Sequence, residues 1–415
     1  MKARLSVYSF FIFFLFLISM ELWIGWGEGN KGIVLAIFGT GALFSKFVLK
    51  IPWDYCARNT FLCTVFYLGY YLIHPQFGVR EFFTQIPTQL FPIFCIVFLR
   101  DDLKPAVLRN ITKWYAWLMV VSIPIYFITS SVDLPSLGTL TNGDRYGTFE
   151  NYFFYVKEYG SADTGIARFG GPFLEPGYLG MVGAFLLFAN LYDFKKKSVI
   201  IILISTLLSF SLAGWVLAFI GYLFVQLYRG KINLKWIMGF VFLMALFICF
   251  GLSYNGGDNL INNEILSRLV YDEDKGFTGN NRNVLTMTVM FLEMWGDTNL
   301  ILHGYPESAF VGLSEWETIG AGLDRFMVFH GLLGVFYVFM FYFLALFYAK
   351  DKKFAWLFFI FILFCFWQRT YALWFSWIIC FHYSCIEQDI KKKVGITSPQ
   401  LKKYGKGLLV HNTPS

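Results

Sequence analysis

The chain has 415 residues, of which 57% are hydrophobic and 21% aromatic, while only 15% are charged. Soluble domains carry about a quarter charged residues, so this composition excludes an ordinary soluble protein. The formal net charge is +7, but the basic residues fall in short clusters between apolar runs. The charge therefore gives no reason to expect nucleic acid as a partner.

Apolar runs of roughly 16–22 residues recur along the chain, and each is long enough to cross a bilayer as a helix. The first run follows Lys2 and Arg4 but continues into Glu21 instead of a small-residue cleavage site, which favours a retained helix over a signal peptide. We expect an all-α polytopic integral membrane protein with about twelve transmembrane helices. The predicted spans are 5–25, 32–49, 59–74, 83–99, 114–131, 174–192, 198–211, 213–228, 236–254, 327–349, 354–368 and 371–387.

The seventh and eighth spans share one apolar stretch, 198–228, which is too long for a single crossing. Ser211, Ala213 and Gly214 interrupt it and are expected to form a turn between two short helices.

Lysine and arginine are concentrated on one side of this arrangement. If both termini are cytoplasmic, most of the 34 basic residues lie on the cytoplasmic side, including the clusters 195–197, 229–235 and 350–353. This distribution satisfies the positive-inside rule. We expect these clusters to contact anionic lipid headgroups, so the lipid bilayer is the first predicted partner.

The same pattern divides the chain into six segments: residues 1–131 with spans one to five, a long outer loop 132–173, spans six to nine at 174–254, a second long outer loop 255–326, the last three spans at 327–390, and a cytoplasmic tail 391–415. Connections as long as these two loops are usually functional or disordered. Both are net acidic, and a guanidinium is well suited to bind phosphate oxygens. Their few arginines are therefore of interest: Arg145, Arg168, Arg268, Arg282 and Arg325.

Other residue patterns predict no metal or cofactor site. The seven cysteines lie in spans or cytoplasmic flanks without disulfide or zinc spacing, which favours buried thiols. Asp272-Glu273-Asp274 fits a solvated loop, and the aromatic residues around Trp367, Trp374 and Trp377 are expected to serve as interfacial belt and packing residues.

Several stretches in order resemble the bacterial O-antigen polymerase and ligase superfamily (Wzy-like proteins). ARFGGPFLEPGYLG at 167–180 is similar to that family's entry to its sixth span, and FSLAGWVLAF at 210–219 to its Ser/Thr-rich break. Gly279-Asn-Asn-Arg282, HGYPESAF at 303–310 and HGLLGVFYVF at 330–339 resemble parts of its second loop and the next span. The resemblance covers about residues 110–350.

This resemblance implies a GT-C-like glycosyltransferase of the bacterial cytoplasmic (inner) membrane, with two periplasmic loops and an active site facing the periplasm. Such a polymerase transfers a growing glycan from undecaprenyl pyrophosphate to the non-reducing end of a lipid-linked repeat unit. No cofactor or metal is implied. The implied partners are undecaprenyl pyrophosphate-linked oligosaccharides and a polysaccharide chain-length regulator.

Catalysis of this kind must stabilise charge on the departing pyrophosphate and remove a proton from the acceptor hydroxyl. By resemblance, Arg168 would bind the pyrophosphate, with help from the helix that starts at Pro176. Glu175 would orient Arg168 or act as the general base. The alternative is that Glu175 and Pro176 only cap the helix, since both residue types favour a first helical turn.

The remaining candidates have weaker sequence support. Arg268, Arg282 and Arg325 are candidate substrate-binding residues, and a solvated surface arginine is the alternative for each. His330 and Asp324 are candidate bases, because histidine titrates near neutral pH and carboxylates accept protons. The ligases have a His-Asn pair some residues before the glycine that corresponds to Gly331. This chain lacks that pair. The difference argues against a ligase and leaves the identity of the general base open.

Two other functions are considered. An O-antigen ligase, or another transferase of the superfamily, would share the fold and the donor and differ in acceptor. A lipid-linked oligosaccharide flippase or secondary transporter would predict ionisable residues at the bilayer midplane and an internal repeat, and the sequence has neither feature.

Overall fold

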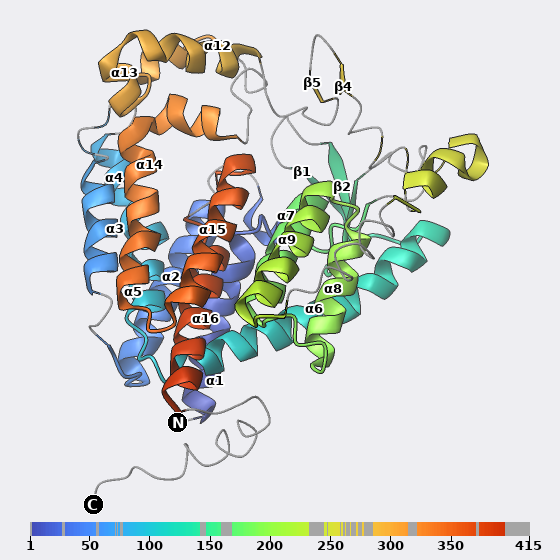
Figure 1. Ribbon diagram of the computed structural model, residues 1–415, viewed down its shortest axis with the longest axis horizontal. Coiled ribbons are helices and arrows are strands. Elements are labelled where there is room, and N and C mark those ends of the chain that lie inside the picture. The colour runs from blue at the N-terminus through green and yellow to red at the C-terminus, as the bar shows by residue number, and fades with distance from the viewer. Residues whose placement is uncertain are drawn as a thin grey trace, which may run out of the picture.

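A computed structural model gives the arrangement of the helices (Figure 1). The structure describes residues 2–26, 30–54, 58–70, 72, 74, 78–141, 147–158, 168–231, 245–246, 248–257, 259, 262, 266, 271–272, 276–277, 285–313, 322–370 and 373–394. In Figure 1 the N-terminus lies at the bottom, and the elements of the two long loops lie at the top, which we call the upper end.

Ten helices of at least 12 residues form most of the described structure. They are α1 (Lys2–Ile18), α2 (Asn30–Val48), α3 (Arg58–Tyr70), α6 (Lys104–Ser131), α7 (Pro176–Ala189), α8 (Lys197–Leu208), α9 (Leu212–Tyr228), α14 (Leu323–Tyr348), α15 (Lys352–Gln368) and α16 (Phe375–Val394).

Shorter elements complete the described chain. The short helices are α4 (Val79–Gln85), α5 (Phe91–Val97), α12 (Leu285–Glu293) and α13 (Thr298–His303), the π-helical turn η2 (Ile86–Leu90), and the 3-10 turns η1 (Trp23–Gly25), η4 (Tyr254–Gly257), η6 (Met294–Gly296) and η7 (Glu307–Phe310). The strands β1 (Thr139–Thr141), β2 (Thr148–Asn151) and β3 (Val156–Glu158) form an antiparallel sheet in that order, and β4 (Tyr271–Asp272) pairs with β5 (Gly276–Phe277).

Three of the described helices, α2, α6 and α14, are long and apolar enough to cross a membrane. Helices α7, α8 and α9 and most of α1 are apolar but shorter. The prediction of a mainly helical membrane protein is thereby confirmed, while the number of about twelve spans stays a prediction. The small sheet in the first long loop was not expected, because its strands are too short to give an alternating pattern.

Helix α7 is the most enclosed of the helices that the structure describes. Every residue from Gly177 to Ala189 is buried, since α8, α9 and α16 pack around the helix. A Cβ atom at Gly214 of α9 would lie 2.7 Å from the Cα of Gly180 in α7. The two backbones therefore meet directly, as small residues allow in membrane helices.

The break between α8 and α9 lies where the sequence predicted a turn. Helix α8 ends at Leu208, and Ser211 caps α9 by accepting a hydrogen bond from the amide of Gly214 at 3.2 Å. This break lies close to the beginning of α7, because a Cβ at Gly180 would lie 2.9 Å from Oγ of Ser209.

Helix α14 is divided at Gly331, whose φ of +60° is open to glycine but strained for other residues. Figure 1 shows its upper part turned away from the lower part, beneath α12 and α13. Gly304, which follows α13, also has a positive φ, and a Cβ there would lie 2.6 Å from the carbonyl oxygen of Val328. The Tyr305 amide donates to the same carbonyl at 2.8 Å, and Val328 packs in a small apolar cluster with Met287 and Met290. Helices α12 and α13 of the second long loop are thereby docked on α14.

The predicted span 83–99 is a broken helix. Pro87 lies in η2, and Pro92 lies in the first turn of α5. Proline has no amide hydrogen to donate, so the backbone between α4 and α5 widens into a π-helical turn. This irregular segment packs against α2, where a Cβ at Gly39 would lie 2.6 Å from the carbonyl oxygen of Pro87.

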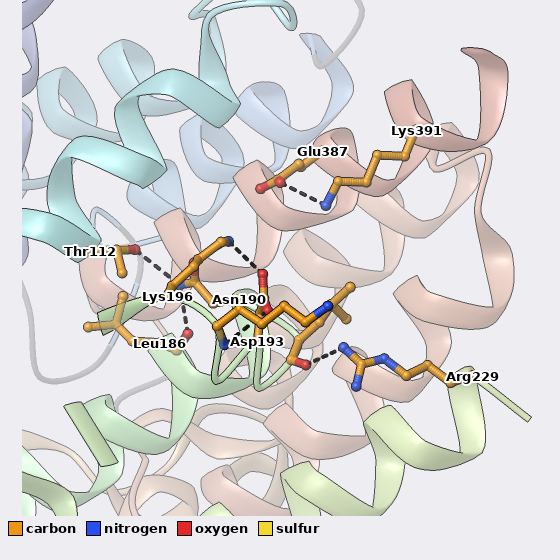
Figure 2. A network of polar contacts seen from close by, with 10 residues as sticks. Thr112, Leu186, Asn190, Asp193, Lys196, Arg229, Glu387 and Lys391 are labelled. Carbon is orange, nitrogen blue, oxygen red and sulfur yellow. Dashed lines mark hydrogen bonds and ion pairs between the residues drawn. The ribbon is translucent and has the colours of Figure 1, made fainter. Parts of the chain in front are cut away.

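At the lower end, side chains tie the helix ends together (Figure 2). The Asn190 amide donates to Oγ1 of Thr112 at 3.0 Å and to the carbonyl of Leu186 at 2.9 Å. Nζ of Lys196 donates to Oδ1 of Asn190 at 3.3 Å. The Lys196 ammonium also lies 4.0 Å from a carboxylate oxygen of Asp193. Burial lowers the pKa of Lys196, an effect that the nearby carboxylates oppose. This network joins α6 to the connection between α7 and α8.

The glycine contact between α7 and α9 can be tested by alanine. Gly214→Ala places a methyl group into the backbone of α7 and should destabilise the protein by about 1–3 kcal/mol. Gly69→Ala in α3 is the matched control, because a Cβ there meets nothing within 4 Å and alanine favours helix. Thermal unfolding in detergent should show a lower midpoint for Gly214→Ala alone. Equal midpoints for the two variants would contradict the close packing.

Candidate functional site

The entrance to α7 is held by the chain that follows α1. The amide of Leu174 donates to the carbonyl of Glu21 at 3.2 Å, and the amide of Trp23 donates to the carbonyl of Pro172 at 3.2 Å. Gly171 turns the chain just before this pairing with a φ of +61°. Because Glu175 follows Leu174 directly, this pairing brings the acidic residues 21 and 175 to the same end of the bundle.

Glu175 forms an ion pair with Arg369. Nη2 of Arg369 donates to Oε2 of Glu175 at 2.8 Å, and Arg369 is only 2% exposed. Arg369 lies directly after α15, and its own amide donates to the carbonyl of Cys365 at 2.8 Å. Glu175 is the N-cap residue of α7, but its side chain makes no capping hydrogen bond. The carboxylate of Glu175 therefore binds Arg369 and does not cap the helix.

A second ion pair and two aromatic rings extend this arrangement. Lys31, in the first turn of α2, pairs with Glu21, and its ammonium lies 5.9 Å from the ring centre of Trp374. The guanidinium carbon of Arg369 lies 4.8 Å from the ring centre of Tyr178, and Tyr178 packs edge-on against Trp374 at 5.2 Å. We call this group the entrance cluster: Glu21, Lys31, Glu175, Tyr178, Arg369 and Trp374.

Arg168 lies next to the break between α8 and α9. Its Nε donates to the carbonyl of Ser209 at 3.4 Å, and its side chain is partly buried. The following residue, Phe169, is fully buried, and its amide donates to the carbonyl of Leu208 at 3.3 Å. These bonds fix Arg168, near the end of the first long loop, against the break between α8 and α9.

The other predicted residues lie on the upper part of α14 or outside the described residues. Asp324 is in the first turn of α14, and the guanidinium of Arg325 lies 4.9 Å from the ring centre of Phe329. The ring centre of His330 lies 4.5 Å from that of Phe326 and 6.0 Å from that of His74. The predicted residues Arg268 and Arg282 fall outside the described residues.

A cavity of about 170 Å³ lies between α14 and the entrance cluster. Phe326 contributes to its wall from the upper part of α14, while Thr370 and Trp374 contribute from the connection between α15 and α16. The candidates on α14 and Arg369 do not line the cavity themselves, but Phe326 and Thr370 follow Arg325 and Arg369 directly in the chain.

Arg369 was missed as a site residue in the sequence, although the sequence contains a signal for it. It is the only Lys, Arg, Asp or Glu between Lys353 and Glu387, and an isolated charge in such an apolar stretch indicates a functional site. The aromatic residues Trp367, Trp374 and Trp377 around it are typical of an interfacial belt, which directed attention away from Arg369. Trp377 is a buried packing residue as expected, whereas Trp374 belongs to the entrance cluster.

This arrangement holds the guanidinium of Arg369 at a defined position. A guanidinium stacked on a ring and bound by a carboxylate has little freedom left, and rigid donors stabilise developing negative charge without reorganisation. The N-terminus of α7 adds backbone amides and the positive end of a helix dipole at the same place. Within the part of the chain that the structure describes, no group of three His, Cys, Asp or Glu is placed to hold a metal ion.

Comparisons of the chain with protein-family models, with curated proteins and with solved structures find no match in any of the three. A functional assignment therefore depends on the residues and the geometry of this chain.

Breaking the Glu175–Arg369 pair on one side should cost more than removing both charges. Arg369→Gln leaves the carboxylate, which is 19% exposed, without its cation, and losing one partner of a buried pair costs about 3 kcal/mol. In Glu175→Gln/Arg369→Gln the two neutral amides can bond each other, so the double variant should be more stable than Arg369→Gln. Thermal unfolding midpoints of the four proteins measure this coupling.

The pair Lys391–Glu387, one turn apart on α16, is the control, because each of its side chains is 25% exposed while that of Arg369 is 3% exposed. Its removal should change stability by about 0–1 kcal/mol. Strictly additive effects of the two changes at positions 175 and 369 would show that the pair is not coupled.

Proposed function

We propose that this protein is a polymerase of O-antigen or another surface polysaccharide. It transfers a growing glycan from undecaprenyl pyrophosphate to the non-reducing end of a lipid-linked repeat unit. The observation that carries the proposal is the ion pair between the buried Arg369 and the partly buried Glu175 at the N-terminus of α7, with Arg168 seven residues earlier in the chain. The family resemblance of residues 167–180 supports the same assignment.

The reaction needs two things from the protein. The bond between the anomeric carbon and the pyrophosphate oxygen breaks, and its electron pair leaves with the lipid pyrophosphate. The acceptor hydroxyl oxygen bonds to the anomeric carbon from the opposite side, with inversion, and its proton passes to a base. The protein must therefore supply fixed cations for the leaving group and one proton acceptor.

In this proposal Arg168 and Arg369 bind the pyrophosphate, assisted by the amides at the start of α7. Glu175 is a positioning residue that fixes the plane of the Arg369 guanidinium. The proton acceptor is one of the two candidates on the upper part of α14, Asp324 or His330. The upper end then faces the periplasm and the basic lower end faces the cytoplasm of a bacterial cell.

The proposal is tested by complementation of cells that carry the matching glycan pathway and lack the polymerase. Surface polysaccharide is separated on a gel, with all variants at equal membrane abundance. We expect Arg168→Ala and Arg369→Lys to remove the ladder of long chains while single repeat units stay attached. Lysine keeps the charge but lacks the planar fork of arginine, and removing one such donor costs about a hundredfold in rate.

Arg58→Ala, which removes an exposed arginine at the start of α3, is the control and should leave the ladder unchanged. Loss of all surface glycan with accumulation of long lipid-linked chains would identify a ligase instead. Accumulation of single lipid-linked units on the cytoplasmic side would identify a flippase. An unchanged ladder in both arginine variants would overturn the proposal.

A further inference from the structure

The cavity beside the entrance cluster is large enough for more than solvent. Its volume of about 170 Å³ exceeds roughly tenfold the 10–15 Å³ that one water molecule needs by the same measure. It extends from the middle of α3 to Thr370, the residue that follows Arg369. The cavity wall therefore includes the residue next to Arg369 in the chain.

The chemistry of the wall is polar but uncharged. Gln85 and Gln89, one helical turn apart on α4 and η2, present two amides, and Tyr67, Phe326 and Trp374 present aromatic rings. No residue described in this wall carries a formal charge. Amides together with aromatic faces, without a charge, suit a neutral ligand that has several hydroxyl groups and an apolar face.

Gln89 lines the cavity, and its Oε1 is buried and has no hydrogen-bond partner among the described residues. An unsatisfied buried polar group costs about 1–3 kcal/mol, so a small rotation of this amide toward the hydroxyl of a ligand would be favourable. The broken helix explains the position of this side chain, because η2 breaks the regular helix at the cavity wall.

We propose that this cavity binds one neutral sugar ring of the glycan. Its hydroxyls bond to the amides of Gln85 and Gln89, and its C–H face packs on an aromatic wall. This inference rests on the proposed function, because it places the pyrophosphate at Arg369 and the sugar beyond Thr370. The pyrophosphate and the sugar ring would thereby lie on two sides of the connection between α15 and α16.

The test uses the purified full-length protein in detergent and three probes, the methyl pyranosides of glucose, galactose and N-acetylglucosamine. Saturation-transfer NMR should show contact with at least one of them. Gln89→Leu and Gln85→Leu, which keep the size of the side chain but remove its amide, should each weaken binding about tenfold. Thr84→Val is the control, because Thr84 is exposed on the same helix and its hydroxyl bonds to Glu81 of that helix.

Transfer to none of the three probes would overturn the inference, as would unchanged binding in both glutamine variants that unfold at the wild-type temperature. The two proposals fail separately. If the probes bind at Gln89 while the arginine variants keep the ladder, the sugar site stands and the polymerase assignment falls. If the ladder needs Arg369 but no probe binds, only the sugar site falls.

Discussion

The ion pair between Glu175 and Arg369 determines how the upper end of the bundle is assembled. It joins the entrance of α7, which is the most enclosed helix, to the connection between α15 and α16, nearly two hundred residues later in the chain. Removing both charges from water is expensive, and the pairing must have good geometry to offset that cost. The backbone pairing of 21–23 with 172–174 supplies a second acidic residue, and Lys31 neutralises it. The entrance cluster therefore combines two cations and two carboxylates without a net charge.

Hydropathy predicted the elements that depend on local sequence. The spans 32–49 and 213–228 agree within a few residues with α2 at Asn30–Val48 and α9 at Leu212–Tyr228, because a long apolar run is a local property. The turn at Ser211 was also readable, since serine and glycine have local capping and turn roles. The division of α14 at Gly331 could not be predicted from the sequence, because it depends on a contact with Gly304 from another part of the chain.

The candidate site shows the same limit. Residues 167–180 could be recognised as unusual because charges and glycines precede an apolar helix. The partner of Glu175 could not be chosen from the sequence, where Arg168 was the nearest cation and Arg369 lay far away. Proximity in sequence suggested Arg168, and a contact between Glu175 and Arg168 stays a prediction, whereas the pairing with Arg369 arises from helix packing, which decides which distant residues meet. The cavity between Gln89 and Thr370 likewise depends on four separate segments and has no signature in any one of them.

The contact between Gly304 and Gly331 has a consequence for how sequence changes would spread through the molecule. A Cβ at Gly331 would lie 2.6 Å from the amide nitrogen of Gly304, and a Cβ at Gly304 would lie 3.1 Å from that of Gly331. The two positions therefore constrain each other although they are 27 positions apart in the chain. Phe326, which forms one wall of the cavity, belongs to the part of α14 that this contact holds in place. A single methyl group added at either glycine would shift Phe326, and with it one wall of the cavity, although neither glycine lines the cavity. The preference of the proposed sugar site for its ligand can therefore vary through substitutions at positions that do not contact the ligand.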